Sequence, residues 1–97
     1  MRIIARSTLR QFWMLHPDAE RPLIEWYALV SKACWINPAA LKQEVRTASI
    51  LKQGRVVFNI AGNKYRLVVA IDYGRQVLWI KFIGTHQTYD NIDAETV

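Results

Sequence analysis

The last third of the chain, residues 55–90, constrains the fold most, because it reads as three strands joined by two tight turns. Gly62-Asn63 is typical of a two-residue hairpin loop, since glycine and asparagine both tolerate a positive φ. If these two residues form the loop, Asn59 lies opposite Arg66 and the two side chains share one face of the hairpin.

A second tight turn is predicted at Tyr73-Gly74, and it would place Arg66 opposite Lys81. The alternate strand positions are apolar and predict a core face: Val56, Phe58, Ile60, Leu67, Val69, Ile71, Leu78, Ile80 and Phe82. The opposite face would carry polar residues, in a central row and at its margins: Asn59, Arg66, Lys81, Arg55 and Lys64. One apolar face and one cationic face on a small sheet indicate a surface that holds phosphate.

The first half of the chain is predicted to be helical after one short strand at residues 2–5. Helices are expected at residues 7–15, 22–34 and 38–45, where apolar residues recur with helical spacing. Asn37-Pro38 is the clearest start signal, since it places a capping side chain before a proline at the first helical position. The order β-α-α-(α)-β-β-β predicts a single α+β domain over residues 1–97, with the N-terminal helices packed on one face of a small antiparallel sheet.

The positive charge of the chain is concentrated in its second half. The net charge is +5, but residues 42–86 hold eight Lys or Arg residues against two acids, Glu44 and Asp72. A basic block on a folded domain is typical of proteins that bind an anionic partner, most often nucleic acid. The alternative is a solvated face that only aids solubility.

The residue types give no indication of a metal, a disulfide or a membrane span. Cys34 is the only cysteine and is predicted to be a packed thiol on the apolar side of the second helix. Asp90 and Asp93 near His86 make a weak ligand set, so neither a metal nor a cofactor is expected. No apolar run approaches the roughly 20 residues of a membrane helix, and the N-terminus lacks a signal-peptide core. A cytoplasmic protein is therefore expected.

The candidate catalytic residues are Arg66, Lys81, His86 and Tyr89. Arg66 and Lys81 face no acid in the predicted pairing and would repel each other unless an anion bridges them. His86 follows the third strand, and an imidazole titrates near neutrality, which suits proton transfer. Tyr89, three residues further on, can donate or accept a hydrogen bond.

The candidate RNA-binding residues are Arg55, Asn59, Lys64 and Trp79. Trp79 falls on the Arg66 face by strand parity and can stack on a base. His16 ends a helix before a proline and is interpreted as structural. If no metal takes part, the natural substrate for these groups is RNA, because its 2′-OH is an internal nucleophile.

Two segments resemble the HigB toxin family of bacterial type II toxin–antitoxin systems, within the RelE-like superfamily: VFNIAGNKYRLVVAIDY and IKFIGTHQTYDNIDA. The resemblance covers residues 55–94, and its most specific parts are the N-x-x-GN-x-YR hairpin and the GTH-x-x-YD end. It implies a RelE-like fold and a small, metal-independent endoribonuclease that cleaves mRNA, commonly on the translating ribosome. It also implies that Arg66, His86 and Tyr89 belong to the active surface.

The resemblance further implies a set of partners: mRNA, the ribosome, a HigA-like helix-turn-helix antitoxin, and operator DNA only through the toxin–antitoxin complex. The leading hypothesis is an mRNA interferase that inhibits translation, in which His86 acts as general acid or base and Tyr89 positions the nucleotide or shares the proton transfer. Two alternatives stay open, since a fold alone does not determine an activity. One is a non-catalytic toxin of the same fold, and the other is a basic nucleic-acid-binding accessory protein.

Overall fold

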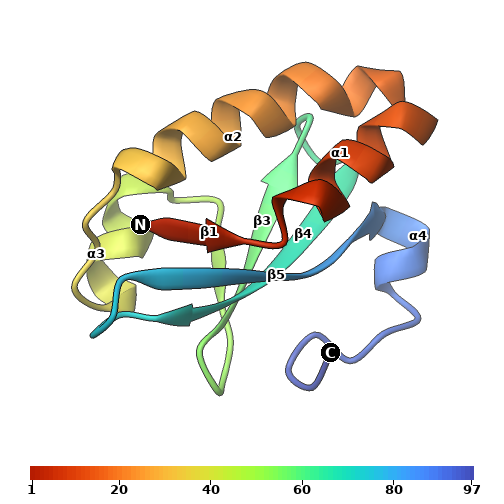
Figure 1. The fold of residues 1–97 in the computed structure, drawn as a ribbon. Coiled ribbons are helices and arrows are strands. Elements are labelled where there is room, and N and C mark those ends of the chain that lie inside the picture. Colours follow the sequence, from red (N-terminus) through yellow and green to blue (C-terminus); the bar gives the residue numbers. More distant parts are fainter.

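The structure is a computed structural model that describes residues 1–97, and it shows the N-terminal helices on one face of a five-stranded sheet (Figure 1). In chain order the elements are β1 (Arg2–Ile4), α1 (Arg6–Leu15), the 3₁₀ turn η1 (Pro17–Ala19), α2 (Glu20–Lys32), α3 (Pro38–Glu44), β2 (Ser49–Ile50), β3 (Arg55–Ile60), β4 (Tyr65–Asp72), β5 (Val77–Thr85) and α4 (His86–Tyr89). The main core joins residues of α1, α2 and α3 to one face of the sheet. The predicted α+β class is confirmed. None of the helices is long and apolar enough to cross a membrane.

The sheet is mixed, because its first strand runs parallel to its neighbour. The strand order is β1-β5-β4-β3-β2, and β1 pairs with β5 in parallel while the other three pairings are antiparallel. The predicted N-terminal strand is therefore present, at the edge beside β5. The other edge is the two-residue strand β2, which the sequence did not predict.

The helix starts and ends follow local chemistry. Asn37 caps α3 as predicted, with its Oδ1 accepting a hydrogen bond from the Ala40 N–H at 2.8 Å. The first helix ends at Leu15, also as predicted. It begins at Arg6, one residue before the expected start, and the chain enters it through Ala5 in the left-handed conformation (φ 74°).

The prediction that Cys34 is a buried helical thiol is wrong. Helix α2 ends at Lys32, and Ala33 takes an extended conformation (φ −74°, ψ 149°). Successive side chains of an extended segment point to opposite sides, so Ala33 and Trp35 enter the core while Cys34 is exposed.

The first hairpin of the sheet has the predicted register. Asn59 pairs with Arg66 and Phe58 with Leu67. Ile60 and Tyr65 are the last paired residues, so residues 61–64 form the loop. The turn is centred on Gly62-Asn63 as predicted, because the Lys64 N–H donates to the Ala61 carbonyl at 3.3 Å. Gly62 has a φ of 69°, which explains the glycine at this position.

The second hairpin has a different register, and the prediction that Arg66 lies opposite Lys81 is wrong. The loop comprises residues 73–76 and is centred on Gly74-Arg75, one residue beyond the predicted Tyr73-Gly74. Asp72 Oδ1 accepts from the Arg75 N–H at 3.1 Å, and Asp72 pairs with Val77. A β-bulge then leaves Lys81 unpaired, since Val69 pairs with Ile80 and Val68 with Phe82. Arg66 consequently lies opposite Gly84.

The bulge also exchanges the faces of the following residues. Ile83 packs against the main core, whereas Phe82, predicted to face it, packs on the other side of the sheet. There it joins a second apolar cluster with Val57 and Val68, which the C-terminal segment covers through Ile92, Ala94 and Val97. The face opposite the helices is therefore partly apolar, and its polar residues are divided into two groups.

Candidate active site

Arg66 is the centre of a group of polar side chains at the end of β4. Its Nη1 donates to Asn59 Oδ1 across the hairpin, and its Nη2 lies 2.8 Å from His86 Nε2. The guanidinium carbon lies 5.7 Å from the centroid of the Tyr89 ring, a cation–π distance. The structure thus brings together Arg66, Asn59, His86 and Tyr89, all four of which the sequence singled out.

The contact with Arg66 determines the protonation of His86 in this arrangement. A guanidinium can only donate hydrogen bonds, so His86 Nε2 must accept and the imidazole is neutral with its proton on Nδ1. That nitrogen lies 3.5 Å from Asp90 Oδ2, one helical turn away. The ring therefore has an acceptor nitrogen directed at the arginine and its N–H edge directed at a carboxylate, which favours this tautomer.

Helix α4 holds His86 and Tyr89 over Arg66 by local capping and by a link to the hairpin. Thr85 ends β5 and caps α4, its Oγ1 accepting from the Thr88 N–H at 3.2 Å. The His86 N–H donates to the Lys64 carbonyl at 3.3 Å. These two contacts fix a helix of only four residues against the end of β4.

Gly84 makes this close approach of α4 possible. A Cβ at this position would lie 2.4 Å from Thr88 Oγ1 and 2.6 Å from Phe82 Cζ. Both distances are shorter than the contacts that Cβ atoms make in proteins. We expect Gly84→Ala to push α4 away from Arg66. Overpacking of this kind costs about 1–3 kcal/mol of unfolding free energy, and a displacement of about 1 Å at a reacting group can lower activity about a hundredfold.

Thermal unfolding and the activity proposed below, measured on the same preparations, test the role of Gly84. The matched control is Gly74→Ala, because a Cβ there meets only Asp72 Oδ1 at 3.5 Å, an ordinary contact. A Gly84→Ala variant with the stability and activity of the control would contradict the close packing of α4.

Lys64 is not a free cation, because it forms an ion pair with Asp18 of η1. Tyr65 also donates its hydroxyl to Asp18, with Oη 2.5 Å from Oδ1. Hydrogen bonds from Lys64 and then from Tyr65 lower the pKa of Asp18. The same contacts raise the pKa of Lys64 and of Tyr65, with burial adding to the shift at Tyr65. The group ties η1 to the hairpin.

The lowered pKa of Asp18 predicts an acid-dependent loss of stability. A carboxylate with a depressed pKa in the folded state stabilises the fold above its unfolded pKa of about 3.9. This contribution disappears as the pH falls through the folded pKa. We expect Asp18→Asn to reduce the loss of Tm on acidification from about pH 5 to pH 2 by no more than a few degrees, because the pair is exposed.

Melting curves across that pH range measure this effect. Glu25→Gln is the control, since Glu25 is an exposed carboxylate without an ion pair. Equal acid sensitivity of Asp18→Asn and the wild type would contradict the linkage.

Arg55 and Trp79, both predicted to bind RNA, lie at the other end of the same face. Both neighbour Ala70, which pairs with Arg55 on one side and with Trp79 on the other. Ala70 lies four positions along β4 from Arg66, which corresponds to a distance of roughly 13 Å along the strand. Arg55 Nη2 donates to the main-chain oxygen of Val97 at 2.8 Å, so it anchors the C-terminal segment. Lys81 is exposed on the bulge and does not face Arg66.

An open hollow of about 760 Å³ adjoins the Arg66–His86 contact. His86 and Lys64 line one part of it, and Leu15, His16 and Asp18 line the other. The sequence interpreted His16 as structural and did not place it beside His86. Its place in the hollow depends on the packing of η1 against a hairpin 46 residues away along the chain. No local pattern in the sequence reports that packing.

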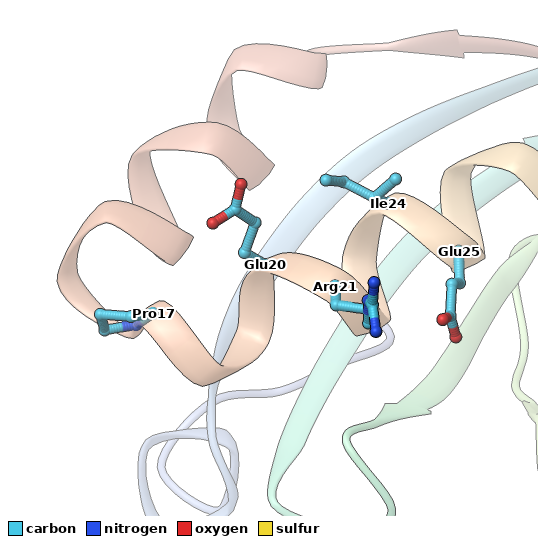
Figure 2. Close-up of a pocket in the computed structure, with 5 residues that line it drawn as sticks. All are labelled: Pro17, Glu20, Arg21, Ile24 and Glu25. Carbon is cyan, nitrogen blue, oxygen red and sulfur yellow. The ribbon is translucent and has the colours of Figure 1, made fainter.

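A second hollow, of about 600 Å³, lies over η1 and the start of α2 (Figure 2). Glu20, Arg21 and Glu25 contribute its charged groups, two of them carboxylates. This charge does not suit an anionic ligand. The chain also contains no group of three or more His, Cys, Asp or Glu side chains arranged to hold a metal ion. The Arg66 group is the candidate site because it joins a cation to an imidazole and a phenol.

Comparison with known proteins agrees with this assignment. A sequence profile named HigB toxin, described as the RelE-like toxic component of a toxin–antitoxin system, matches residues 19–92. The mRNA interferase toxin HigB of Escherichia coli strain K12 is 25% identical over 96 residues, which is 97% of this chain and 92% of that protein. The mRNA interferases HigB of Escherichia coli O157:H7 and of Shigella flexneri match over the same extent with the same identity. Since the profile spans more than half of the chain, this protein belongs to the HigB toxin family of RelE-like toxic components of toxin–antitoxin systems.

Proposed function

We propose that this chain is an mRNA interferase, a metal-independent endoribonuclease that uses the 2′-OH of RNA as its nucleophile. The observation that carries the proposal is the 2.8 Å contact between Arg66 Nη2 and His86 Nε2. It places a permanent cation beside a neutral imidazole, the two groups that phosphate-centred proton transfer requires. The names of the relatives from Escherichia coli and Shigella flexneri point to the same activity.

Arg66 would bind the scissile phosphate. A guanidinium has five N–H donors, and Asn59 and His86 engage one on each Nη atom. One N–H on each Nη therefore remains for the phosphate oxygens. As the 2′ oxygen attacks, negative charge grows on these oxygens, and a preoriented cation stabilises it.

His86 would act as the general base. The lone pair of its Nε2, which accepts from Arg66 Nη2 in this structure, would exchange that contact for the 2′-OH of the RNA and take its proton. The 2′ oxygen then attacks phosphorus, and the bond from phosphorus to the 5′ oxygen breaks. The leaving oxygen takes up a proton, for which the Tyr89 phenol beside the guanidinium is a donor. The products are a 2′,3′-cyclic phosphate and a 5′-hydroxyl. The imidazolium then returns its proton to solvent, and the Tyr89 phenolate takes one up from solvent.

The remaining candidates have supporting roles in this proposal. Lys81 is exposed on β5, and we propose that it contacts a phosphate further along the strand rather than the reacting one. We assign the same kind of contact to Lys64, Arg55 and Trp79, each weakened by its distance from Arg66 or by its protein partner. Asn59 would orient Arg66 rather than bind RNA directly.

As the toxic component of a toxin–antitoxin system, the chain has an antitoxin as its partner. We propose that the antitoxin is a HigA-like helix-turn-helix protein and that the complex, not the toxin alone, binds operator DNA. We further propose that residues 1–97 act as a single toxin domain in the cytoplasm, where they cleave mRNA on the translating ribosome and so inhibit translation.

Primer-extension mapping of cellular mRNA after brief induction tests the activity. We expect discrete new 5′ ends within coding regions, and cleavage of a purified transcript or ribosome–mRNA complex that persists in EDTA. Growth arrest with intact transcripts would contradict the nuclease proposal and favour a non-catalytic toxin. Normal growth with intact transcripts would leave an accessory nucleic-acid-binding role.

A further inference from the structure

The hollow beside His86 has features of a second ligand-binding site. It lies between the end of α1 with η1 on one side and α4 with the hairpin on the other. His86 belongs both to the hollow and to the Arg66 group. Any polynucleotide with a phosphate on Arg66 would therefore have an adjoining nucleotide at the mouth of this hollow.

His16 presents a fixed imidazole to the hollow. Its ring stacks on Phe12 with centroids 4.3 Å apart and an interplanar angle of 22°. The Tyr65 ring packs edge-to-face with it, and the two ring centroids lie 5.4 Å apart. No side chain or main-chain group of the protein hydrogen-bonds its ring nitrogens, and neither is a buried atom. The ring is thus held rigidly while both nitrogens remain available to a ligand.

Gln87 and Leu15 complete a surface that suits a nucleobase. The Gln87 amide is exposed and makes no hydrogen bond within the chain, so it can both donate and accept. Leu15 is 80% exposed and offers an apolar contact at the rim. Amide groups that read a base edge beside apolar or aromatic surface are typical of single-stranded RNA recognition.

The charge of the hollow favours a base over a phosphate. Lys64 is neutralised by Asp18 within it. The unpaired cation nearby is Arg66, at the adjoining site rather than in the hollow. A neutral hollow next to a cationic centre matches the division of a nucleotide into an uncharged base and an anionic phosphate.

We propose that this hollow binds the base of a nucleotide next to the scissile phosphate and contributes to cleavage-site preference. His16 and Gln87 contact the base edge, and Leu15 packs against the base or its ribose. The inference rests on the proposed ribonuclease function for its position relative to the cut. It adds His16, Gln87 and Leu15 to the RNA-binding surface.

Two variants separate base recognition from folding. His16→Phe keeps an aromatic ring to stack on Phe12 while it removes both ring nitrogens. Gln87→Ala removes an exposed amide. Gln43→Ala, an exposed glutamine on α3 outside the hollow, is the matched control.

The first readout is the affinity for short RNA oligonucleotides that carry 2′-O-methyl groups and differ at one base, measured by fluorescence anisotropy. These probes cannot be cleaved through the 2′ oxygen, so the result does not depend on catalysis. We expect the wild type to prefer one base roughly tenfold, the control to keep this preference, and both hollow variants to lose most of it. A wild type with no preference, or hollow variants that keep it, would overturn the inference.

The second readout is the distribution of cleavage sites in a long transcript. We expect the hollow variants to cut at additional sites while the control cuts as the wild type does. If the wild type binds the probes with base preference but cuts no RNA, the proposed nuclease function fails and the base site stands. If it cuts RNA and both hollow variants retain its site pattern, the base site fails and the nuclease function stands.

Discussion

Replacing Arg66 with alanine is expected to lower the rate of mRNA cleavage about a hundredfold or more, by analogy with the loss of a preoriented donor to a developing oxyanion. The substitution removes the only cation in direct contact with His86 and releases Asn59. Because the guanidinium also binds the ground-state phosphate, RNA affinity should fall as well. Single-turnover rates on a defined transcript, with RNA binding measured separately, quantify both effects.

Two control variants distinguish a specific role of Arg66 from general electrostatic attraction. Arg66→Lys keeps the charge but loses the planar, two-pronged geometry, so we expect an intermediate rate. Arg55→Ala removes the same charge at the other end of the face, where the arginine binds Val97, and should leave the chemical step nearly unchanged. If Arg55→Ala and Arg66→Ala reduce the rate equally, Arg66 acts only through net charge.

The difference between the two hairpins shows what sequence pattern can predict here. The Asn59–Arg66 register depends on a tight turn centred on Gly62-Asn63 with a glycine at positive φ, and this information is contained within eight residues. The second register depends on a four-residue loop closed by an aspartate side chain and on a bulge at Lys81. A bulge changes the parity of every residue that follows it, so the mistake displaced Lys81 and exchanged Phe82 with Ile83.

The candidate site was predictable in part because its members lie close together in the sequence or on one hairpin. Arg66, His86 and Tyr89 came from the hairpin and from the residues that follow β5, and the structure brings them into contact. Asp90 was considered only as a weak metal ligand, although its distance of 3.5 Å from His86 Nδ1 suits an orienting role. His16 and Asp18 could not be placed, because their positions depend on how η1 packs against the hairpin.

The structure also changes the interpretation of the basic residues on the sheet. The sequence predicts one continuous cationic face, but Val57 and Val68 interrupt it beneath the C-terminal segment. Arg55 binds a main-chain oxygen and Lys64 binds a carboxylate. Arg66 contacts the His86 imidazole and has no carboxylate partner of its own. Catalytic specificity would then come from this one position, and the wider basic surface would supply salt-dependent attraction.

Replacing His86 with alanine is expected to lower the cleavage rate by about a hundredfold to ten-thousandfold, the usual contribution of a general acid or base. RNA affinity should change little, because the imidazole that accepts from Arg66 is neutral and its removal takes away no charge. The wild-type rate should fall as the pH is lowered, since a protonated Nε2 can neither accept from Arg66 nor take the 2′-OH proton.

Single-turnover rates between about pH 5 and pH 8 for the wild type, His86→Ala and His16→Phe test this role. His16 is the only other histidine of the chain. If His86 is the base, the loss of rate at low pH persists in His16→Phe and is absent from the residual activity of His86→Ala. The opposite pattern would identify His16 as the base that takes the 2′-OH proton. A His86→Ala variant with both a wild-type rate and a wild-type pH profile would contradict the role of His86 as the base.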